Sequence, residues 1–405
     1  MLGKIYTIDN VEVKGKTLLV RIDLNSSIGE DGKIQLNSRF LSHGKTIVEL
    51  AKKGAKVVAI CHQGRPGDSE FRSLREHAAL LSQATGIDVH FLQDIFGPAS
   101  LDKIKNLAEG EVLLLENLRL LSEEMLERSS TDAAKSLHVQ KLSSCVDLFV
   151  NDAFSVAHRS QASIVGFNAL LPSVAGRVMQ CELNAVERLL QRQNGAVFLL
   201  GGVKFKEVLD LAEAVCKNGK AKKILFTGAC ALLFLKAKGL ALGEPTEIKL
   251  EKLDANNYIR RAKVLLEGYP DVIATPVDVA VDQDAKRKEY PTVDLPVNYP
   301  ILDIGMKTIS KYCQLITGAE TVFAKGAPGN FEKREFSHST RELCTALANS
   351  KAFTVLGGGS LLTAFEAFKL DKAKISHVSL SGGALLEALA GKSLPGVEAL
   401  EKHQL

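Results

Sequence analysis

The sequence predicts an α/β protein with two doubly wound domains, each built around a parallel sheet. Short β-branched and aliphatic runs alternate with longer amphipathic stretches, and this alternation is typical of βαβ units. The alternation occurs twice, on either side of one long helical pattern. At 405 residues the chain is also long enough to bury more than one hydrophobic core. We therefore expect two Rossmann-like domains joined by a long helix, with a cleft between them.

The first series of elements predicts four strands with helices between them. Each predicted strand is a short apolar run that ends at polar or turn-forming residues, and each predicted helix has apolar residues at helical spacing. The strands are expected at 17–22, 56–61, 112–115 and 146–150, and the helices at 42–53 and 74–85.

A long connecting helix is predicted over 173–192. It starts after a proline, ends near a glycine and carries apolar residues at helical spacing, namely Val174, Val178, Leu183, Val186 and Leu190. The second series of strands is expected near 196–200, 223–227, 272–274, 321–324 and 352–356. These limits give a first domain over 1–172, the helix, and a second domain over 193–384.

Composition excludes several classes of protein. Apolar residues make up 46% of the chain and charged residues 24%, which is ordinary for a globular protein. The net charge of +4 gives no reason to expect nucleic acid or a membrane as partner. Seven cysteines without a CxxC pair fit a reducing compartment better than a disulfide framework or a zinc site. Because no apolar run resembles a signal core or a membrane span, we expect a cytoplasmic location.

Polar and cationic residues follow the predicted strands of the first domain. They occur in the segments RIDLNSSI, CHQGRPG, LLLENLRL and VNDAFSVAHRSQASIVG. The carboxyl ends of parallel strands form the ligand-binding edge of an open sheet. Several arginines at one such edge suit a small anion with phosphate and carboxylate groups. The candidates are Asp23, Asn25, His62, Arg65, Arg119 and Arg159.

Glycine-rich turns follow the predicted strands of the second domain. FLLGGVKFKE and FTVLGGGSLLTAF carry them, and FAKGAPGNFE and ILFTGACALL are similar. Glycine lets backbone N–H groups approach phosphate oxygens, and the N-terminus of the following helix adds donors. Neither GxxxxGK[ST] nor GxGxxG occurs, so the chain lacks both a P-loop and the usual dinucleotide fingerprint.

Taken together, these segments resemble phosphoglycerate kinases, and they are most similar in spelling to the archaeal branch of that family. The matching segments stand in family order along essentially the whole chain. They are RIDLNS, SRF from Ser38, HQGRP, ENLR, NDAFSVAHR, LGGVK, TGACALLFLKAKG, TPVDVAV, DIGMKT, GNFE, LGGGS and HVSLSGGALLEALAGKSLPGVEAL. The combination is specific, although several single segments are not.

The resemblance implies an enzyme of glycolysis and gluconeogenesis that transfers a phosphoryl group between 1,3-bisphosphoglycerate and ADP, giving 3-phosphoglycerate and ATP with Mg²⁺. It implies a monomer or a dimer, in which residues 385–405 return to the first domain. The phosphoglycerate would be held by Asp23, Leu24, Asn25, Arg39, His62, Gln63, Gly64, Arg65, Arg119 and Arg159. The nucleotide would be held by Gly201, Gly202, Lys204, Gly228, Glu332, Gly357, Gly358, Gly359, Ser360 and Leu361, with Glu332 on the ribose.

The chemistry fits these residue types. A substrate carboxylate is already ionised at neutral pH, so the reaction requires in-line positioning and charge compensation rather than a protein nucleophile or base. Arg39 from one domain and Lys204 from the other are the expected catalytic residues. Because the two substrates would be held by different domains, we expect closure about the connecting helix.

Some positions depart from the family pattern. Ser360 is a weaker metal partner than the usual acid, so Mg²⁺ would be held by the nucleotide and water or by Glu207 or Asp210. Val208 stands where the family has a second lysine, and Lys206 could take the role of that lysine. Lys325 stands where the family usually has an asparagine. A noncatalytic or weakened anion-binding protein is therefore the alternative, while a dehydrogenase would need the missing fingerprint. The choice between ATP and GTP stays open, and the charge run over 286–289 is expected to be solvated.

Overall fold

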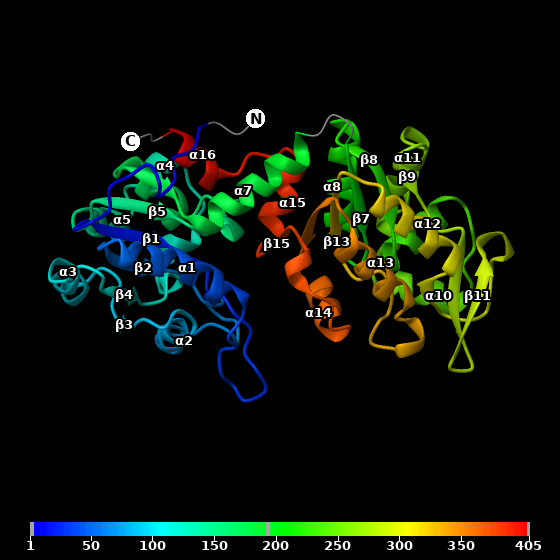
Figure 1. Ribbon diagram of the computed structural model, residues 1–405, viewed down its shortest axis with the longest axis horizontal. Coiled ribbons are helices and arrows are strands. Elements are labelled where there is room, and N and C mark those ends of the chain that lie inside the picture. Colours follow the sequence, from blue (N-terminus) through cyan, green and yellow to red (C-terminus); the bar gives the residue numbers. More distant parts are fainter. Residues whose placement is uncertain (1–3, 192–194, 403–405) are drawn as a thin grey trace. The chain divides into compact units, whose positions relative to one another are not determined.

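The computed structural model describes residues 4–191 and 195–402. The chain divides into two compact units, coloured by sequence in Figure 1. The first unit holds the residues up to Asn184 together with those from Ser393 on, and the second unit is Ala185–Lys392. Helix α7, Arg177–Leu190, crosses the boundary between them.

The first unit is built on a six-stranded parallel sheet with the order β3-β4-β2-β1-β5-β6. Its strands are β1 Thr17–Arg21, β2 Lys56–Ile60, β3 Val89–Leu92, β4 Val112–Leu115, β5 Leu148–Asn151 and β6 Ser173–Ala175. Its helices are α1 Ser38–Lys52, α2 Arg75–Thr85, α3 Pro98–Lys105, α4 Ser130–Ala133, α5 Leu137–Ser143, α6 Ala162–Val165 and α16 Pro395–Lys402.

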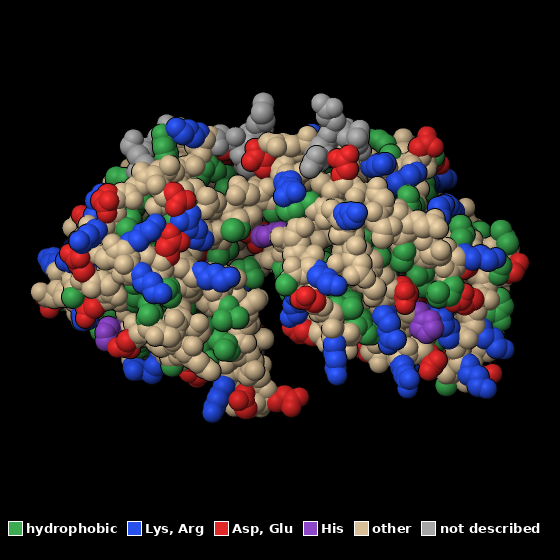
Figure 2. All heavy atoms as spheres, in the orientation of Figure 1, with side chains coloured by type: hydrophobic (Ala, Val, Ile, Leu, Met, Phe, Trp, Pro, Cys, Tyr) green, Lys and Arg blue, Asp and Glu red, His purple; other side chains and the backbone are tan. Residues whose placement is uncertain are grey.

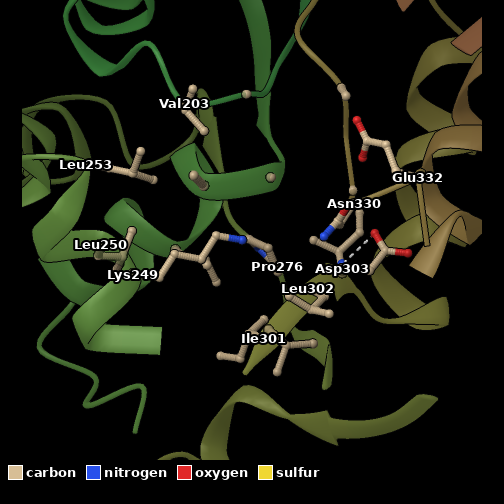
Figure 3. Close-up of a pocket in the computed structure, with 18 residues that line it drawn as sticks. Val203, Lys249, Leu250, Leu253, Pro276, Ile301, Leu302, Asp303, Asn330 and Glu332 are labelled. Carbon is tan, nitrogen blue, oxygen red and sulfur yellow. Dashed lines mark hydrogen bonds between the residues drawn. The ribbon is translucent and has the colours of Figure 1, made fainter. Parts of the chain in front are cut away.

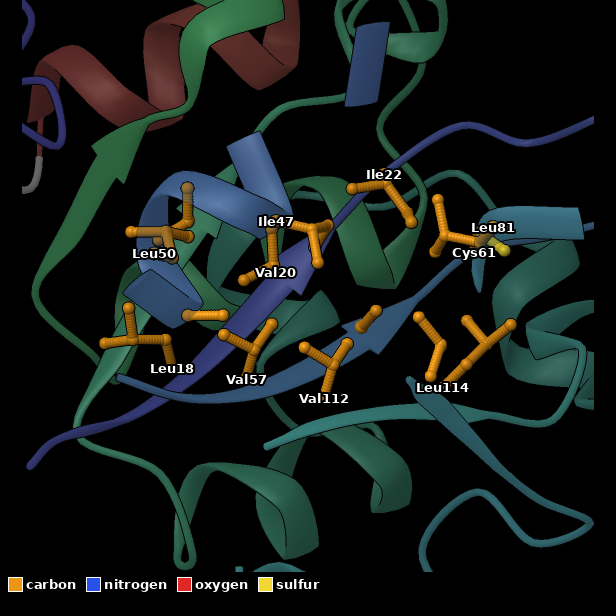
Figure 4. Packing of buried hydrophobic residues seen from close by; sticks show 14 of the residues in the cluster. Leu18, Val20, Ile22, Ile47, Leu50, Val57, Cys61, Leu81, Val112 and Leu114 are labelled. Carbon is orange, nitrogen blue, oxygen red and sulfur yellow. The ribbon is translucent and has the colours of Figure 1, made fainter. Parts of the chain in front are cut away.

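Both faces of this sheet are buried, which explains why its strands are continuous apolar runs. Leu18 and Val20 of β1 enter the core that α1 and α2 cover, whereas Leu19 between them enters the core on the other face. Figure 4 shows the first of these cores, where Ile47 and Leu50 of α1 pack over the strands.

The second unit contains a six-stranded parallel sheet with the order β15-β14-β13-β7-β8-β9 and a three-stranded antiparallel sheet with the order β11-β10-β12. Its strands are β7 Ala196–Leu200, β8 Ala221–Phe226, β9 Ile273–Ala274, β10 Asp278–Gln283, β11 Lys286–Pro291, β12 Ile301–Ile304, β13 Thr321–Lys325, β14 Phe353–Gly357 and β15 His377–Ser379. Its helices are α8 Phe205–Lys217, α9 Gly228–Ala237, α10 Glu244–Lys252, α11 Ile259–Gly268, α12 Met306–Thr317, α13 His338–Asn349, α14 Gly359–Ala367 and α15 Gly383–Leu389.

The α/β fold class is confirmed, and each predicted strand has a counterpart with ends shifted by a residue or two. The predicted helix over 173–192 is wrong at its start. Its first three residues are β6, which pairs with β5, and α7 begins only at Arg177. The break falls at Gly176, where a Cβ would lie 2.2 Å from Oδ1 of Asp152. That carboxylate accepts the N–H of Val178 at 2.8 Å and so caps the helix, while the predicted end at 192 lies outside the described residues.

Two further expectations need correction. Residues 385–392 belong to the second unit, because α15 packs on α8, and only the residues from Ser393 on belong to the first unit. There the N–H of Gly396 donates to the carbonyl of Ala157 at 2.9 Å. The charge run over 286–289 is not wholly solvated, since it forms part of β11 and the side chain of Arg287 is only 8% exposed in an ion pair with Asp303.

Surface charge is mixed. On the faces drawn in Figure 2, Lys and Arg side chains lie among Asp and Glu over both units. Among the described residues, no helix combines the length and apolarity needed to cross a bilayer.

Candidate active site

The first unit gathers its polar site residues at the carboxyl edge of the sheet. Asp23 follows β1, His62 follows β2, Arg119 lies in the 3₁₀ turn Leu118–Leu120 after β4, and Arg159 follows the turn Phe154–Val156 after β5. Because β4, β2, β1 and β5 are consecutive in the sheet, their ends deliver these side chains to one rim.

Asp23 is the anionic anchor of this rim. Its Oδ1 accepts the N–H of Asn25 at 3.0 Å, and its Oδ2 accepts hydrogen bonds from the side chains of Arg39 and Ser155. Burial alone would raise the pKa of Asp23, but the charge of Arg39 and the hydrogen bonds hold it below its usual value. The ionised carboxylate therefore fixes the Arg39 guanidinium, whose side chain is 26% exposed.

Among the described residues, Arg119 and Arg159 form no ion pair with a carboxylate like that of Arg39, and they repel each other. Arg119 is 5% exposed and donates to the carbonyl of Gly64. Burial, followed by the charges of Arg159, Arg21 and Arg65, lowers the pKa of Arg119 to about 10. Burial and Arg65 lower the pKa of Arg159 as well. The rim thus holds more positive charge than its own acids compensate, which suits an anionic ligand.

His62 is held as a neutral donor. The guanidinium of Arg21 lies 3.1 Å from its Nδ1, and since arginine only donates, Nδ1 accepts and the ring proton is on Nε2. Burial lowers the pKa of His62 in spite of Asp23, and Arg21, Arg119 and Arg159 act in the same direction. Arg21 itself is fully buried and was not predicted, because it reads as part of the apolar run of β1.

The remaining predicted residues of the first unit shape the loops. Oδ1 of Asn25 accepts the N–H of Gly64 at 2.9 Å, which ties the loops after β1 and β2 together. Gly64 has φ +63, and a Cβ there would lie 2.5 Å from the backbone of Phe71. Leu24 and Gln63 are completely buried, and the backbone N–H of Gln63 donates to Oδ1 of Asn117 at 3.2 Å, so Gln63 holds the loop rather than facing the rim. Arg65 is exposed.

The second unit contains a pocket of about 270 Å³. Three predicted nucleotide residues line it, namely Gly202, Gly228 and Glu332. Figure 3 shows Leu250 and Leu253 on one side of the pocket and Asn330 and Glu332 on the other. The described residues Gly201, Lys204 and Gly357–Leu361 lie outside its lining.

Most of the pocket wall is apolar and was not predicted. It includes Val203, Leu232, Leu250, Leu253, Pro276, Val279 and Ile301. In the sequence these residues cannot be told from core positions of helices and strands. A flat heterocyclic base is mostly apolar on its faces, and an apolar slot with polar groups at one end fits it.

Asp303 forms a buried polar corner of this pocket. It accepts from Nη1 of Arg287 at 2.8 Å and from the N–H of Ser339 at 3.1 Å. Burial raises the pKa of Asp303 against the effect of Ser339 and Arg287. Gly329 passes so close that a Cβ there would lie 2.4 Å from Oδ1 of Asp303, so this carboxylate supports the loop that carries Asn330.

Glycine turns stand at the carboxyl ends of three strands in the parallel sheet of the second unit. Gly201–Gly202 follow β7, Gly228 starts α9 after β8, and Gly357–Gly359 join β14 to α14. Ser360 is exposed in the first turn of α14, while Leu361 is buried. Within the described chain, no three His, Cys, Asp or Glu side chains are grouped so as to form a metal site.

Comparison with known proteins agrees with these features. The family model described as phosphoglycerate kinase matches residues 8–392. Phosphoglycerate kinases of Methanothermus fervidus and Sulfolobus acidocaldarius are each 41% identical to the chain, covering 98% of it and 97% and 95% of their own lengths. The structure of the Pyrococcus horikoshii phosphoglycerate kinase has a TM-score of 0.89 at 36% identity, covering 98% of both chains. That of the Coxiella burnetii enzyme has a TM-score of 0.84 at 30% identity, covering 99% of this chain and all of that one. The chain therefore belongs to the phosphoglycerate kinase family, whose members are phosphotransferases with a carboxyl group as acceptor.

Proposed function

We propose that this chain catalyses reversible phosphoryl transfer from 1,3-bisphosphoglycerate to ADP, giving 3-phosphoglycerate and ATP. The observation that carries the proposal is the rim of partly buried arginines whose positive charge exceeds that of the acids beside it. Its depressed arginine pKa values favour a ligand with several negative charges, because such a ligand would relieve the repulsion. Phosphoglycerate carries both a phosphate and a carboxylate.

We assign the phosphoglycerate to the first unit. Arg65, Arg119 and Arg159 would bind its phosphate through bidentate hydrogen bonds. Asp23, Asn25 and His62 would bind its hydroxyl and carboxylate ends, with Nε2–H of His62 as a donor. Arg39 would contact the transferred phosphoryl group, since Asp23 already holds its guanidinium in place.

We assign the nucleotide to the second unit. The base would occupy the apolar pocket, and Glu332 at its edge would accept from the ribose hydroxyls. The glycine turns would offer backbone N–H groups to the phosphates, and Lys204 would contact the group in transfer. Transfer then requires that both units bring their substrates together, which is the expected role of domain closure.

Magnesium would arrive with the nucleotide. Mg²⁺ keeps several waters and is held largely by substrate phosphates, and the exposed hydroxyl of Ser360 would add one weak protein oxygen. When bound, the ion would neutralise charge that develops on the phosphate oxygens. Glu207 and Asp210, the other expected ligands, already form ion pairs with lysine or arginine side chains.

A coupled assay tests the proposal. The full chain is incubated with 3-phosphoglycerate and MgATP, and the product is followed through its NADH-dependent reduction. Turnover supports the kinase. Binding of 3-phosphoglycerate without turnover would instead support the noncatalytic alternative, and absence of both would contradict the site. The same assay with MgGTP measures the base preference.

A further inference from the structure

Two lysines of the second unit meet on one carboxylate beside the first glycine turn. Lys204 is the residue before α8, and Lys325 is the last residue of β13. Strands β7 and β13 are parallel neighbours, with Lys325 opposite Leu200. Both lysines therefore emerge at the same carboxyl edge of the sheet.

The contacts between these groups are direct. Nζ of Lys325 lies 2.8 Å from Oε2 of Glu207, and Nζ of Lys204 lies 3.5 Å from Oε1 of the same carboxylate. Glu207 stands in the first turn of α8, where the helix dipole favours negative charge. One carboxylate thus faces two ammonium groups and the positive end of a helix.

The backbone around Lys325 is fixed against the Gly201–Gly202 turn. The N–H of Gly201 donates to the carbonyl of Lys325 at 2.8 Å. Gly326 has φ +77, and a Cβ there would lie 2.2 Å from the carbonyl of Gly201. The end of β13 is therefore held directly beside the turn that we assign to the nucleotide phosphates.

The two lysines differ in how far their side chains are buried. The side chain of Lys325 is 12% exposed, whereas that of Lys204 is 70% exposed. Burial lowers the pKa of Lys325 even though Glu207 opposes this effect. The pKa of Glu207 is lowered because its pairing with Lys325 outweighs its own partial burial. A lysine held this far from water is unfavourable unless an anion compensates it.

We propose that Lys325 is a second catalytic lysine, which contacts the transferred phosphoryl group together with Lys204, and that the Glu207 carboxylate marks where phosphoryl oxygens bind. In the ATP-consuming direction, the bond from the γ-phosphorus to the β,γ-bridging oxygen breaks and ADP leaves with the electron pair. The bond to the carboxylate oxygen of 3-phosphoglycerate forms on the opposite side, and no protein group gains or loses a proton. Lys325 would compensate charge on the equatorial oxygens. This inference rests on the proposed function.

Lys206 is the other candidate for this role, since it lies beside Glu207 in the first turn of α8. Its Nζ pairs with Asp210 at 2.9 Å, and its side chain is 71% exposed. It therefore points along the helix toward solvent rather than to Glu207. K206M is the control, because it removes an ion-paired lysine from the turn of α8 that carries Glu207.

The experiment compares the full-length wild type with K325M, K206M and E207Q in the assay with 3-phosphoglycerate and MgATP. K325M is expected to lower kcat about a hundredfold, as the loss of one donor to a transition-state oxygen does. K206M is expected to stay close to wild type. Calorimetric titration with MgATP in the absence of 3-phosphoglycerate adds a second readout. E207Q is expected to bind MgATP at least as tightly as wild type, because the carboxylate that competes with the γ-phosphoryl oxygens is gone.

A merely structural ion pair would give a different pattern, with K325M and E207Q affected alike in stability and activity. That pattern would overturn the inference. A kcat of K325M within about threefold of wild type, or a large loss of kcat in K206M, would overturn it as well. If K325M does not fold, the double variant E207Q/K325M leaves no buried unpaired charge, because Lys204 is 70% exposed, and it is held to the same hundredfold expectation. An inactive wild type would refute the proposed function instead, so the two failures are distinguishable.

Discussion

Replacing Arg159 by methionine is expected to stabilise the ligand-free protein and to weaken its stabilisation by 3-phosphoglycerate. Burial and Arg65 lower the pKa of Arg159, so its positive charge destabilises the folded state when no anion is bound. Methionine keeps the apolar stem and removes the charge. The two effects therefore have opposite signs in the free and the bound protein.

The size of the first effect follows from the neighbouring arginine. The pKa of Arg119 falls to about 10, which corresponds to about 3 kcal/mol against its charged form. Burial is the largest cause, and Arg159 is the first of the three repelling arginines. Repulsion between two such charges is on the order of 1 kcal/mol in a well-solvated setting, and we take this value for the removal of Arg159. For a unit of this size, that corresponds to a rise of about 2–4 °C in the unfolding midpoint.

The second effect follows from binding linkage. At a concentration of 100 times its Kd, 3-phosphoglycerate stabilises the wild type by about 2.7 kcal/mol. Loss of the Arg159 contact weakens binding by at least about 2 kcal/mol, the size of one charge-assisted hydrogen bond, so at the same concentration R159M gains less than about 1 kcal/mol. The variant should therefore be the more stable protein without ligand and the less stable one with it.

Scanning calorimetry with and without 3-phosphoglycerate measures both effects. R128M is the matched control, because Arg128 is exposed and its backbone N–H bonds to Ser160, one residue after Arg159. A ligand-free midpoint of R159M below wild type, combined with an unchanged ligand-induced gain, would refute the reasoning. R128M should differ little from wild type in either state.

Three other predictions concern single side chains. R39M should lower kcat about a hundredfold with a smaller change in KM for 3-phosphoglycerate, as steady-state kinetics will show, because Arg39 is assigned to the group in transfer. E332Q should raise KM for the nucleotide about tenfold and leave that for 3-phosphoglycerate unchanged, in the same assay. Burial lowers the pKa of His77 to about 4, from 6.5 in the unfolded chain. The unfolded state therefore binds more protons in this window, and stability that is present above pH 6.5 is lost by up to about 3 kcal/mol as the pH falls to 4. Urea unfolding at pH 6.5 and pH 4 should show that H77Q loses less free energy of unfolding than wild type does. An equal loss in the two proteins would mean that other groups cause the pH dependence.

The parallel sheets could be predicted because their strands are buried on both faces. Val112–Leu115 is a continuous apolar run, and all four residues are buried in the structure. Such runs are recognisable without knowledge of the partners. The antiparallel sheet was not predicted, because β11 has the sequence KRKEYP, in which most residues are charged and most are exposed. Its one buried guanidinium, that of Arg287, pairs with Asp303 of β12, sixteen residues further along the chain.

The candidate site could be predicted where polar residues follow apolar runs. Arg119 and Arg159 stand out in this way, whereas Arg21 is hidden inside the run of β1 and is recognised only by its contacts with His62 and Ser163. The apolar pocket of the second unit could not be predicted, since Leu250 of α10 looks like any core residue. The ion pair of Lys325 with Glu207 joins residues that are 118 positions apart, and no local sequence pattern predicts it.

A crystal structure of the full chain with 3-phosphoglycerate and MgADP tests the central claim most directly. We expect the phosphate of 3-phosphoglycerate within hydrogen-bond distance of Arg65, Arg119 and Arg159, and the base of ADP in the pocket beside Glu332. Phosphoglycerate bound away from these arginines, or a nucleotide outside the pocket, would contradict it.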